Sequence, residues 1–319
     1  MTTTTKFEDA APRGHAQAGM RGVMVPVLIG TLTGAIFVTV FLTLFHAPTP
    51  HRLPLGVVGT VEAVQARLDA QRPGAFTLTS FADAQRATEA IQRREIYGAL
   101  LQNEGKVLVA GANGPSVTAT VSQALQGQRV EDVLPSSAGD TAGLSTFYAG
   151  FGVVLAGFLF GQISYGMAPR LALRSRLLSI GIFGVLNGVL VALISSGLNA
   201  LPGNVVLLAL VVALVATAVA AATVTIIRLA GPVGTTISSV LLLILGNATG
   251  GGTLPVAYLP EWLQWVSGVL PVGVGVRAIK GVSYFQNDGL VVGLLVLAAW
   301  IAVCAGVLFL KDRRVQLAG

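Results

Sequence analysis

Charged residues are scarce in this sequence of 319 residues, of which only 11% are Asp, Glu, Lys or Arg. A soluble domain carries about 25%. The apolar residues, 53% of the chain, gather in long runs without charge. Such runs exclude an ordinary soluble protein and predict helices that cross a membrane.

Cysteine is nearly absent as well. Cys304 is the only one and lies within an apolar run, which excludes an intrachain disulfide and a Cys-rich metal site. The three histidines, His15, His46 and His51, do not share a helical face, so a His-ligated metal is not expected.

Motifs that carry chemistry are also missing. The sequence has no GxxxxGK[ST] loop to hold phosphates and no HExxH, CxxC or GxSxG, and its carboxylates are scattered without an evident catalytic pair. We therefore expect no enzymatic activity and no cofactor bound by this chain. The net charge of +6 comes from basic clusters beside apolar runs, without interleaved aromatic residues, so nucleic acid is not expected as a partner.

The apolar runs predict about six transmembrane helices. Gly22–Phe45 is the first and is interpreted as a retained helix, because no small-x-small cleavage site follows it. Residues 144–310 are expected to supply five more. These are Phe147–Ala168, two helices within Leu177–Ile227 separated by the turn at Gly197–Asn204, Val233–Asn247, and Leu290–Leu310.

Residues 46–143 differ from the rest because they hold most of the acidic residues. Their alternating and helical patterns follow the order β-α-β-α-β-β-α, which predicts a mixed sheet with helices packed on it. The predicted fold class is therefore an α-helical polytopic membrane protein with an inserted extracytoplasmic α/β domain between the first two crossings.

The distribution of basic residues predicts the orientation. If the N-terminus is cytoplasmic, the segments on that side carry ten basic residues and three acidic ones. The basic residues are Lys6, Arg13, Arg21, Arg170, Arg174, Arg176, Arg228, Lys311, Arg313 and Arg314. Because short cytoplasmic loops are enriched in Lys and Arg, we expect both tails, residues 1–21 and 311–319, to be cytoplasmic.

A segment at about residues 254–281 has no full crossing. Its uncharged part, Trp262–Val276, is too short to span the bilayer and is broken by Pro255, Pro260 and Pro271. Irregular backbone at membrane depth is tolerated only where protein or a water-filled cavity covers it. The segment is either a re-entrant wall or gate of a pathway, or a pair of interfacial helices that anchor the protein.

Two polar side chains, Gln162 and Asn187, lie within predicted crossings. They either form hydrogen bonds between helices or line a substrate path. Four small-residue spacings, GTLTG at Gly30, GFLFG at Gly157, GVLNG at Gly184 and GLVVG at Gly289, favour close helix packing or a dimer. No charged residue lies deep in a predicted crossing, which argues against a proton-coupled pump.

The order of these parts resembles permeases of ABC transporters of the type-2 exporter class (ABC-2 type), in the branch that includes phage-infection-protein-like membrane proteins. The segment LPVAYLPEWLQWVSGVLPVGVGVRAIKG, from Leu254 to Gly281, is similar to the re-entrant segment of that family. The matching residues are Pro255, Pro260, Trp262, Leu270, Pro271 and Arg277.

This resemblance implies a permease subunit that dimerises with itself or a second permease and pairs with a cytoplasmic ATPase subunit, which would export a hydrophobic or amphipathic substrate. The implied contact with the ATPase is the loop that contains Arg170, Arg174 and Arg176. The composition, rich in Ala, Gly, Val and Arg, is typical of a GC-rich bacterium, so we expect the plasma membrane. The alternative hypothesis is a receptor or cell-envelope scaffold whose outer domain binds a partner.

Overall fold

The computed structural model of the protein describes residues 14–318. Residues 1–13 of the predicted N-terminal tail and the final residue of the predicted C-terminal tail lie outside this range. Five helices in the described range are long and apolar enough to cross a membrane. They are α1 Gly14–Phe45, α5 Ser145–Met167, α6 Leu173–Gly197, α7 Val205–Ala230 and α12 Leu290–Ala318. The chain is therefore a multi-pass helical membrane protein, as its apolar runs predict.

The number of crossings depends on a bent helix pair near the C-terminus. The pair consists of α10 Glu261–Val269 and α11 Pro271–Ser283, and it brings the total to six if it is counted as one span. The predicted crossing at 233–247 forms a shorter helix, made of α8 Val233–Ser238, the π-helix η3 Ser239–Gly246 and α9 Asn247–Thr249. At an α-helical rise this stretch spans about 25 Å, less than the hydrocarbon core of about 30 Å.

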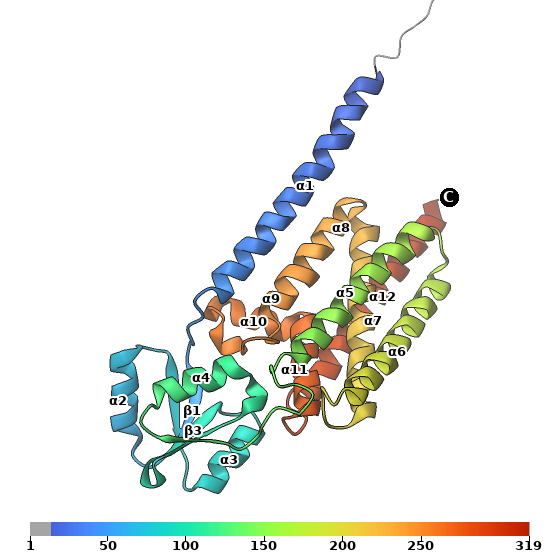
Figure 1. Ribbon diagram of the computed structural model, residues 1–319. Coiled ribbons are helices and arrows are strands. Elements are labelled where there is room, and N and C mark those ends of the chain that lie inside the picture. Colours follow the sequence, from blue (N-terminus) through green and yellow to red (C-terminus); the bar gives the residue numbers. More distant parts are fainter. Residues whose placement is uncertain (1–13, 319) are drawn as a thin grey trace, which may run out of the picture.

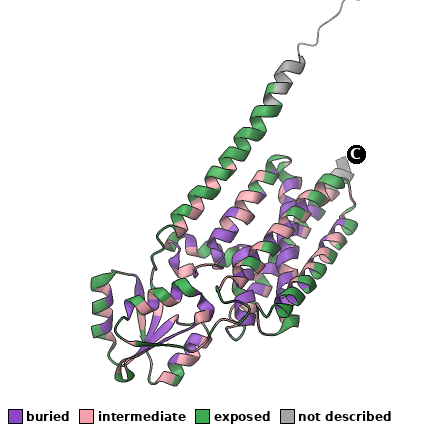
Figure 2. Ribbon diagram, viewed as in Figure 1, coloured by how far each residue is buried: buried purple, intermediate pink, exposed green. Residues whose placement is uncertain are grey.

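Helix α7 is the centre of the bundle. Of its most apolar stretch 56% is buried, compared with 0% for α1, and Figure 2 shows residues 22–45 of α1 as exposed or half-buried. Glycines bring α5 and α6 close to α7: a Cβ on Gly157 would lie 3.0 Å from the Val219 side chain, and one on Gly188 only 2.4 Å from the carbonyl oxygen of Ala209. The spacings at Gly157 and Gly184 thus pack α5 and α6 against α7, and the one at Gly289 lies against α11, whereas the one at Gly30 meets no described atom.

Residues 53–132, named the sheet region below, form a five-stranded sheet with three covering helices. The elements are β1 Leu53–Val58, α2 Val61–Gln71, β2 Phe76–Ser80, α3 Ala84–Gln92, β3 Gly98–Leu101, β4 Lys106–Val109, α4 Pro115–Ala124 and β5 Arg129–Asp132. The strand order is β2-β1-β3-β4-β5. Only β3 and β4 pair antiparallel, while the other neighbours are parallel.

Each face of the sheet has its own hydrophobic core. On one face α2 and α4 contribute buried residues such as Leu68 and Val121, and on the other α3 contributes Ala87 and Ile91. Asp83 begins α3 as its cap, since its carboxylate accepts a hydrogen bond from the backbone N–H of Arg86 at 2.8 Å. The alternating strands and amphipathic helices therefore fold as their patterns predict.

The sheet region and the bent pair lie at one end of the bundle, and the start of α1 and the end of α12 lie at the other (Figure 1). The connection between α5 and α6, which contains Arg170, lies at the second end, as does Arg228 near the end of α7. The basic connections thus share one end of the bundle, opposite the sheet region.

Candidate functional site at the bent helix pair

The bend between α10 and α11 follows from one dipeptide. Leu270 has an extended backbone (φ −72°, ψ 141°) and precedes Pro271, which occupies the first position of α11. A residue before proline is disfavoured in helical conformation, and proline itself fits the first turn of a helix. The two helix axes therefore meet at 79°, which places a short amphipathic helix, α10, across the end of the bundle.

Helix α10 carries two large exposed aromatic residues. Trp262 and Trp265 are 72% and 66% exposed, whereas Leu263 and Val266 on the opposite face are buried. Tryptophan prefers the boundary between hydrocarbon and headgroups. An exposed tryptophan face beside buried aliphatic residues therefore matches a helix that lies along the membrane surface.

An apolar cleft of about 480 Å³ separates α10 from α1. One wall is α1 from Thr39 to Leu44, the second is the π-helix η3 through Leu241 and Leu245, and the third is α10. Leu44 joins two of these walls by packing against the buried face of α10. Its volume lies in the range of small-molecule pockets, and an apolar lining suits a hydrocarbon chain.

The π-helix in one wall of the cleft is a feature that the sequence patterns did not predict. Side chains near its C-terminal end hydrogen-bond to carbonyls inside it: Asn247 Nδ2 donates to Leu243 O at 2.9 Å, and Thr249 Oγ1 donates to Leu245 O at 2.8 Å. π-Helical turns are rare and occur frequently at functional sites. Here the widened helix forms part of the cleft wall.

Arg277 of α11 is held by an ion pair. Its Nη2 and Nε donate to Asp288 at 2.9 Å and 3.1 Å, which is the bidentate geometry of strong Arg–carboxylate pairs. Asp288 also lies 3.7 Å from Arg94 of the sheet region. Arg277 therefore braces the loop after α11 and is not directed into the apolar cleft.

The structure brings together only some of the pathway residues predicted from sequence. Pro260 and Trp262 line the cleft, Pro271 makes the bend, and the buried Pro255 precedes the short helix η4, Val256–Tyr258. These residues form one neighbourhood at the end of the bundle near the sheet region.

Gln162 and Asn187 lie elsewhere. Gln162 accepts a hydrogen bond from Thr235 of α8 at 2.9 Å, at the end of the Val233–Thr249 helix that is remote from the bent pair. The side-chain oxygen of Asn187 is buried and has no hydrogen-bond partner among the described residues. Neither residue lines the apolar cleft.

Three arginines lie in the connection between α5 and α6 or at the start of α6, and two of them are exposed. Arg170 and Arg174 are exposed. Arg176 is fully buried: its Nη2 donates to Ala168 O at 2.5 Å and to Pro169 O at 3.3 Å, and the guanidinium lies 5.4 Å from the centre of the Tyr165 ring. Arg176 thus satisfies carbonyls just after α5 and, because it is buried at the start of α6, offers no exposed group for the ATPase contact that the resemblance implies.

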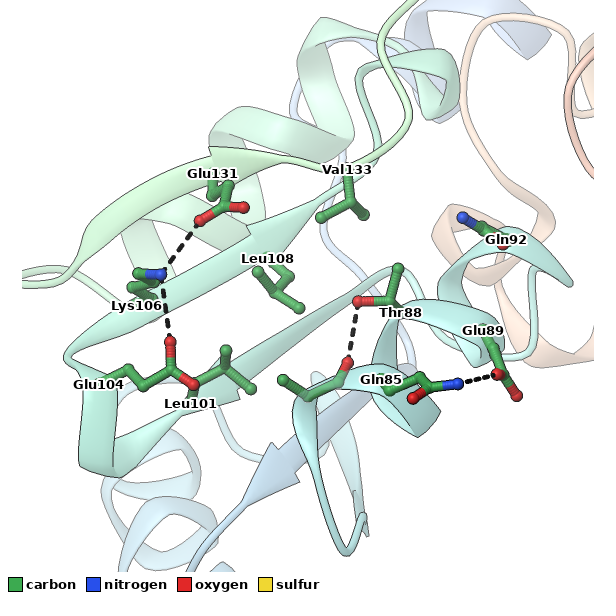
Figure 3. Close-up of a pocket in the computed structure, with 11 residues that line it drawn as sticks. Gln85, Thr88, Glu89, Gln92, Leu101, Glu104, Lys106, Leu108, Glu131 and Val133 are labelled. Atoms are coloured by element: carbon green, nitrogen blue, oxygen red, sulfur yellow. Dashed lines mark hydrogen bonds and ion pairs between the residues drawn. The ribbon is translucent and has the colours of Figure 1, made fainter.

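A second, more polar groove lies on the sheet region beside α3 (Figure 3). It measures about 420 Å³, and Leu108 and Val133 contribute to its lining. At one end Lys106 lies between Glu104 and Glu131, at 3.1 Å and 3.4 Å. The hydrogen bond that Lys106 donates to Glu104 and the negative charge of Glu131 raise the pKa of Lys106 above its usual value.

No family model matches this chain, and no curated protein or solved structure matches it. The fold and the site therefore define a class only. That class is a multi-pass helical membrane protein with an apolar cleft between its first long helix and a bent helix pair.

Proposed function

We propose that the chain is the membrane-spanning permease subunit of an ATP-driven exporter that moves a hydrophobic or amphipathic substrate outward. The apolar cleft at the bent pair is the observation that supports this proposal most. One of its walls is α1, which leans away from the bundle (Figure 1). A hydrophobic substrate would enter such a cleft laterally from the bilayer without passing through water.

In the proposed orientation both termini are cytoplasmic and the sheet region is an extracytoplasmic domain in the plasma membrane of a bacterium. The positions of the basic residues support this, since Arg170, Arg174 and Arg228 lie at the end of the bundle opposite the sheet region. Cytoplasmic loops of membrane proteins are enriched in such residues.

The energy for export would come from a separate ATPase subunit, because the sequence has no phosphate-binding loop. Exposed Arg170 and Arg174 are the residues available for that contact. Close packing around α7 leaves the cleft, or an interface between two permease chains, as the route for a substrate. A dimer of this chain, or a pair with a second permease, provides both an ATPase contact and a route for the substrate.

Purification of the chain from membranes of its own source tests the ATPase contact. After chemical crosslinking in intact membranes, we expect a P-loop ATPase to copurify, and we expect the double variant Arg170→Glu, Arg174→Glu to reduce its yield. Arg129→Glu, an exposed charge reversal in β5 of the sheet region, is the matched control and should have no effect. If no ATPase copurifies with the unmodified chain, the proposal is contradicted.

A receptor or cell-envelope scaffold is the second candidate, and the groove beside α3 favours it (Figure 3). Val133→Arg would place a long charged side chain in that groove. If the scaffold hypothesis holds, this variant loses a crosslinked envelope partner while efflux of hydrophobic dyes stays unchanged. If the exporter proposal holds, efflux depends on the cleft residues of α10 instead.

A further inference from the structure

The loops on either side of the bent pair carry aromatic side chains into the sheet region. Tyr258 precedes α10 by three residues and Phe285 follows α11 by two. Tyr258 is 4% exposed and belongs to the core beneath α2 and α4, whereas Phe285 is fully buried in the core beneath α3. The bent pair is thus held at both of its ends, in the two opposite cores of one sheet.

Polar contacts reinforce this attachment. Lys280 of α11 is buried and its Nζ donates to the backbone oxygen of Asn113 at 3.2 Å. Arg94, at the end of the α3 segment, lies 5.3 Å from the centre of the Phe285 ring and 3.7 Å from Asp288. Gln286 also donates to Gln92 of α3 at 3.1 Å. These contacts come from two separate parts of the sheet region, the segment around Asn113 and the end of α3 with the residues after it.

We propose that the sheet region and the bent pair move as one rigid body, so that any tilt of the sheet region moves α10 and changes the width of the apolar cleft. Only two residues, Leu259 and Pro260, separate Tyr258 from α10, and a single residue separates α11 from Phe285. Linkers this short transmit a displacement because they cannot absorb it. A ligand bound on the sheet region would thereby act on the cleft, whether or not the chain is an exporter.

The opposite wall of the cleft is packed less tightly, although α1 leads through residues 46–52 directly into β1. The apolar part of α1 is wholly exposed or half-buried, and its main packing against α10 is through Leu44 near its end. Movement of α10 with the sheet region would therefore change its separation from α1. If it does, the sheet region and the cleft are coupled through this movement.

Distance measurements between spin labels in lipid nanodiscs test the rigid body. The labels are attached in a Cys304→Ala background. One pair joins α2 to α10 through Ala66→Cys and Gly268→Cys, and both positions are exposed. A Cβ added at Gly268 meets no described atom within 4 Å. The reference pair, Ala66→Cys and Gln85→Cys, lies wholly within the sheet region. We expect the two distance distributions to be equally narrow, and a broader or multi-peaked distribution between α2 and α10 would overturn the proposal.

Substitution of the aromatic residues tests the attachment itself. Phe285→Ala and Tyr258→Ala should each broaden the distribution between α2 and α10 while the reference pair within the sheet region stays narrow. Phe309→Ala, an exposed aromatic residue of α12, is the matched control and should change neither. If both alanine variants keep the narrow distribution of the unmodified chain, the aromatic residues do not hold the two parts together and the inference fails.

Discussion

Replacing Gly188 of α6 with alanine tests whether α7 is the packing centre of the bundle. The new Cβ would lie 2.4 Å from Ala209 O and 2.7 Å from the Cβ of Ala213, where ordinary contact begins at 3.4 Å. Helices α6 and α7 would have to separate by about 1 Å. Overpacking of this kind costs about 1–3 kcal/mol.

Gly30→Ala in α1 is the matched control, because no described atom lies within 4 Å of its added Cβ. Both substitutions gain the same helix propensity of about 1 kcal/mol, so the difference between them isolates the packing cost. Unfolding in mixed micelles with increasing SDS measures it, and Gly188→Ala should be less stable than Gly30→Ala by about 1–3 kcal/mol. Equal stabilities would refute the close approach of α6 and α7.

Three further predictions follow from named contacts. Trp262→Ala together with Trp265→Ala should weaken binding of a hydrophobic fluorescent probe to the cleft without unfolding the chain. Titration of the probe into nanodiscs measures its affinity. An unchanged affinity would exclude the cleft as the binding site of the probe. Arg176→Met should lower the free energy of unfolding in SDS by about 1–3 kcal/mol because buried carbonyls lose their donor, whereas Arg174→Met, at an exposed position, should not. Equal free energies of unfolding for the two variants would refute the cap. The pKa of Lys106 is raised in the folded state, so its ion pairs should stabilise the sheet region below about pH 10 and be lost only as the pH rises further. The stability difference between the unmodified chain and Lys106→Met should accordingly stay constant at neutral pH and shrink in strong alkali.

The parts of the fold that the sequence predicts well are those with strong periodicity. Uncharged runs define the long helices, alternation defines β2, and short apolar runs bounded by turn residues define β1, β3 and β4. Strand β5, with the sequence RVED and all four residues exposed, has no such pattern. It is held in place by pairing with β4, which is a tertiary contact that no local sequence pattern records.

Side-chain environments were harder to predict than elements. Thr60 directly precedes α2 and is a residue type that favours the cap position, but its side chain forms no capping bond in the described structure. Its backbone N–H instead donates to Gln102 Oε1 at 2.6 Å, a partner 42 residues away. Arg176 shows the same limit, because a basic residue at a helix end has the same sequence signature whether it faces water or folds back onto carbonyls.

For the candidate site, the prolines and tryptophans of the 254–281 segment indicated the bent pair because their effects on backbone and membrane depth are local. The cleft itself was not predictable, since α1 lies far from η3 and α10 in the sequence and only their packing creates it. The roles of Tyr258 and Phe285 were missed for the same reason. The sequence signal for these roles was one large aromatic residue shortly before and one shortly after the segment that forms the bent pair.

Cysteine accessibility in intact cells tests the membrane orientation on which the account depends. In a Cys304→Ala background, Ala70→Cys lies on the exposed face of α2 and Ser175→Cys is exposed in the first turn of α6. We predict that a membrane-impermeant maleimide labels the first variant directly and the second only after the cells are permeabilised. Direct labelling at position 175 with protection at position 70 would place the sheet region in the cytoplasm and contradict the account.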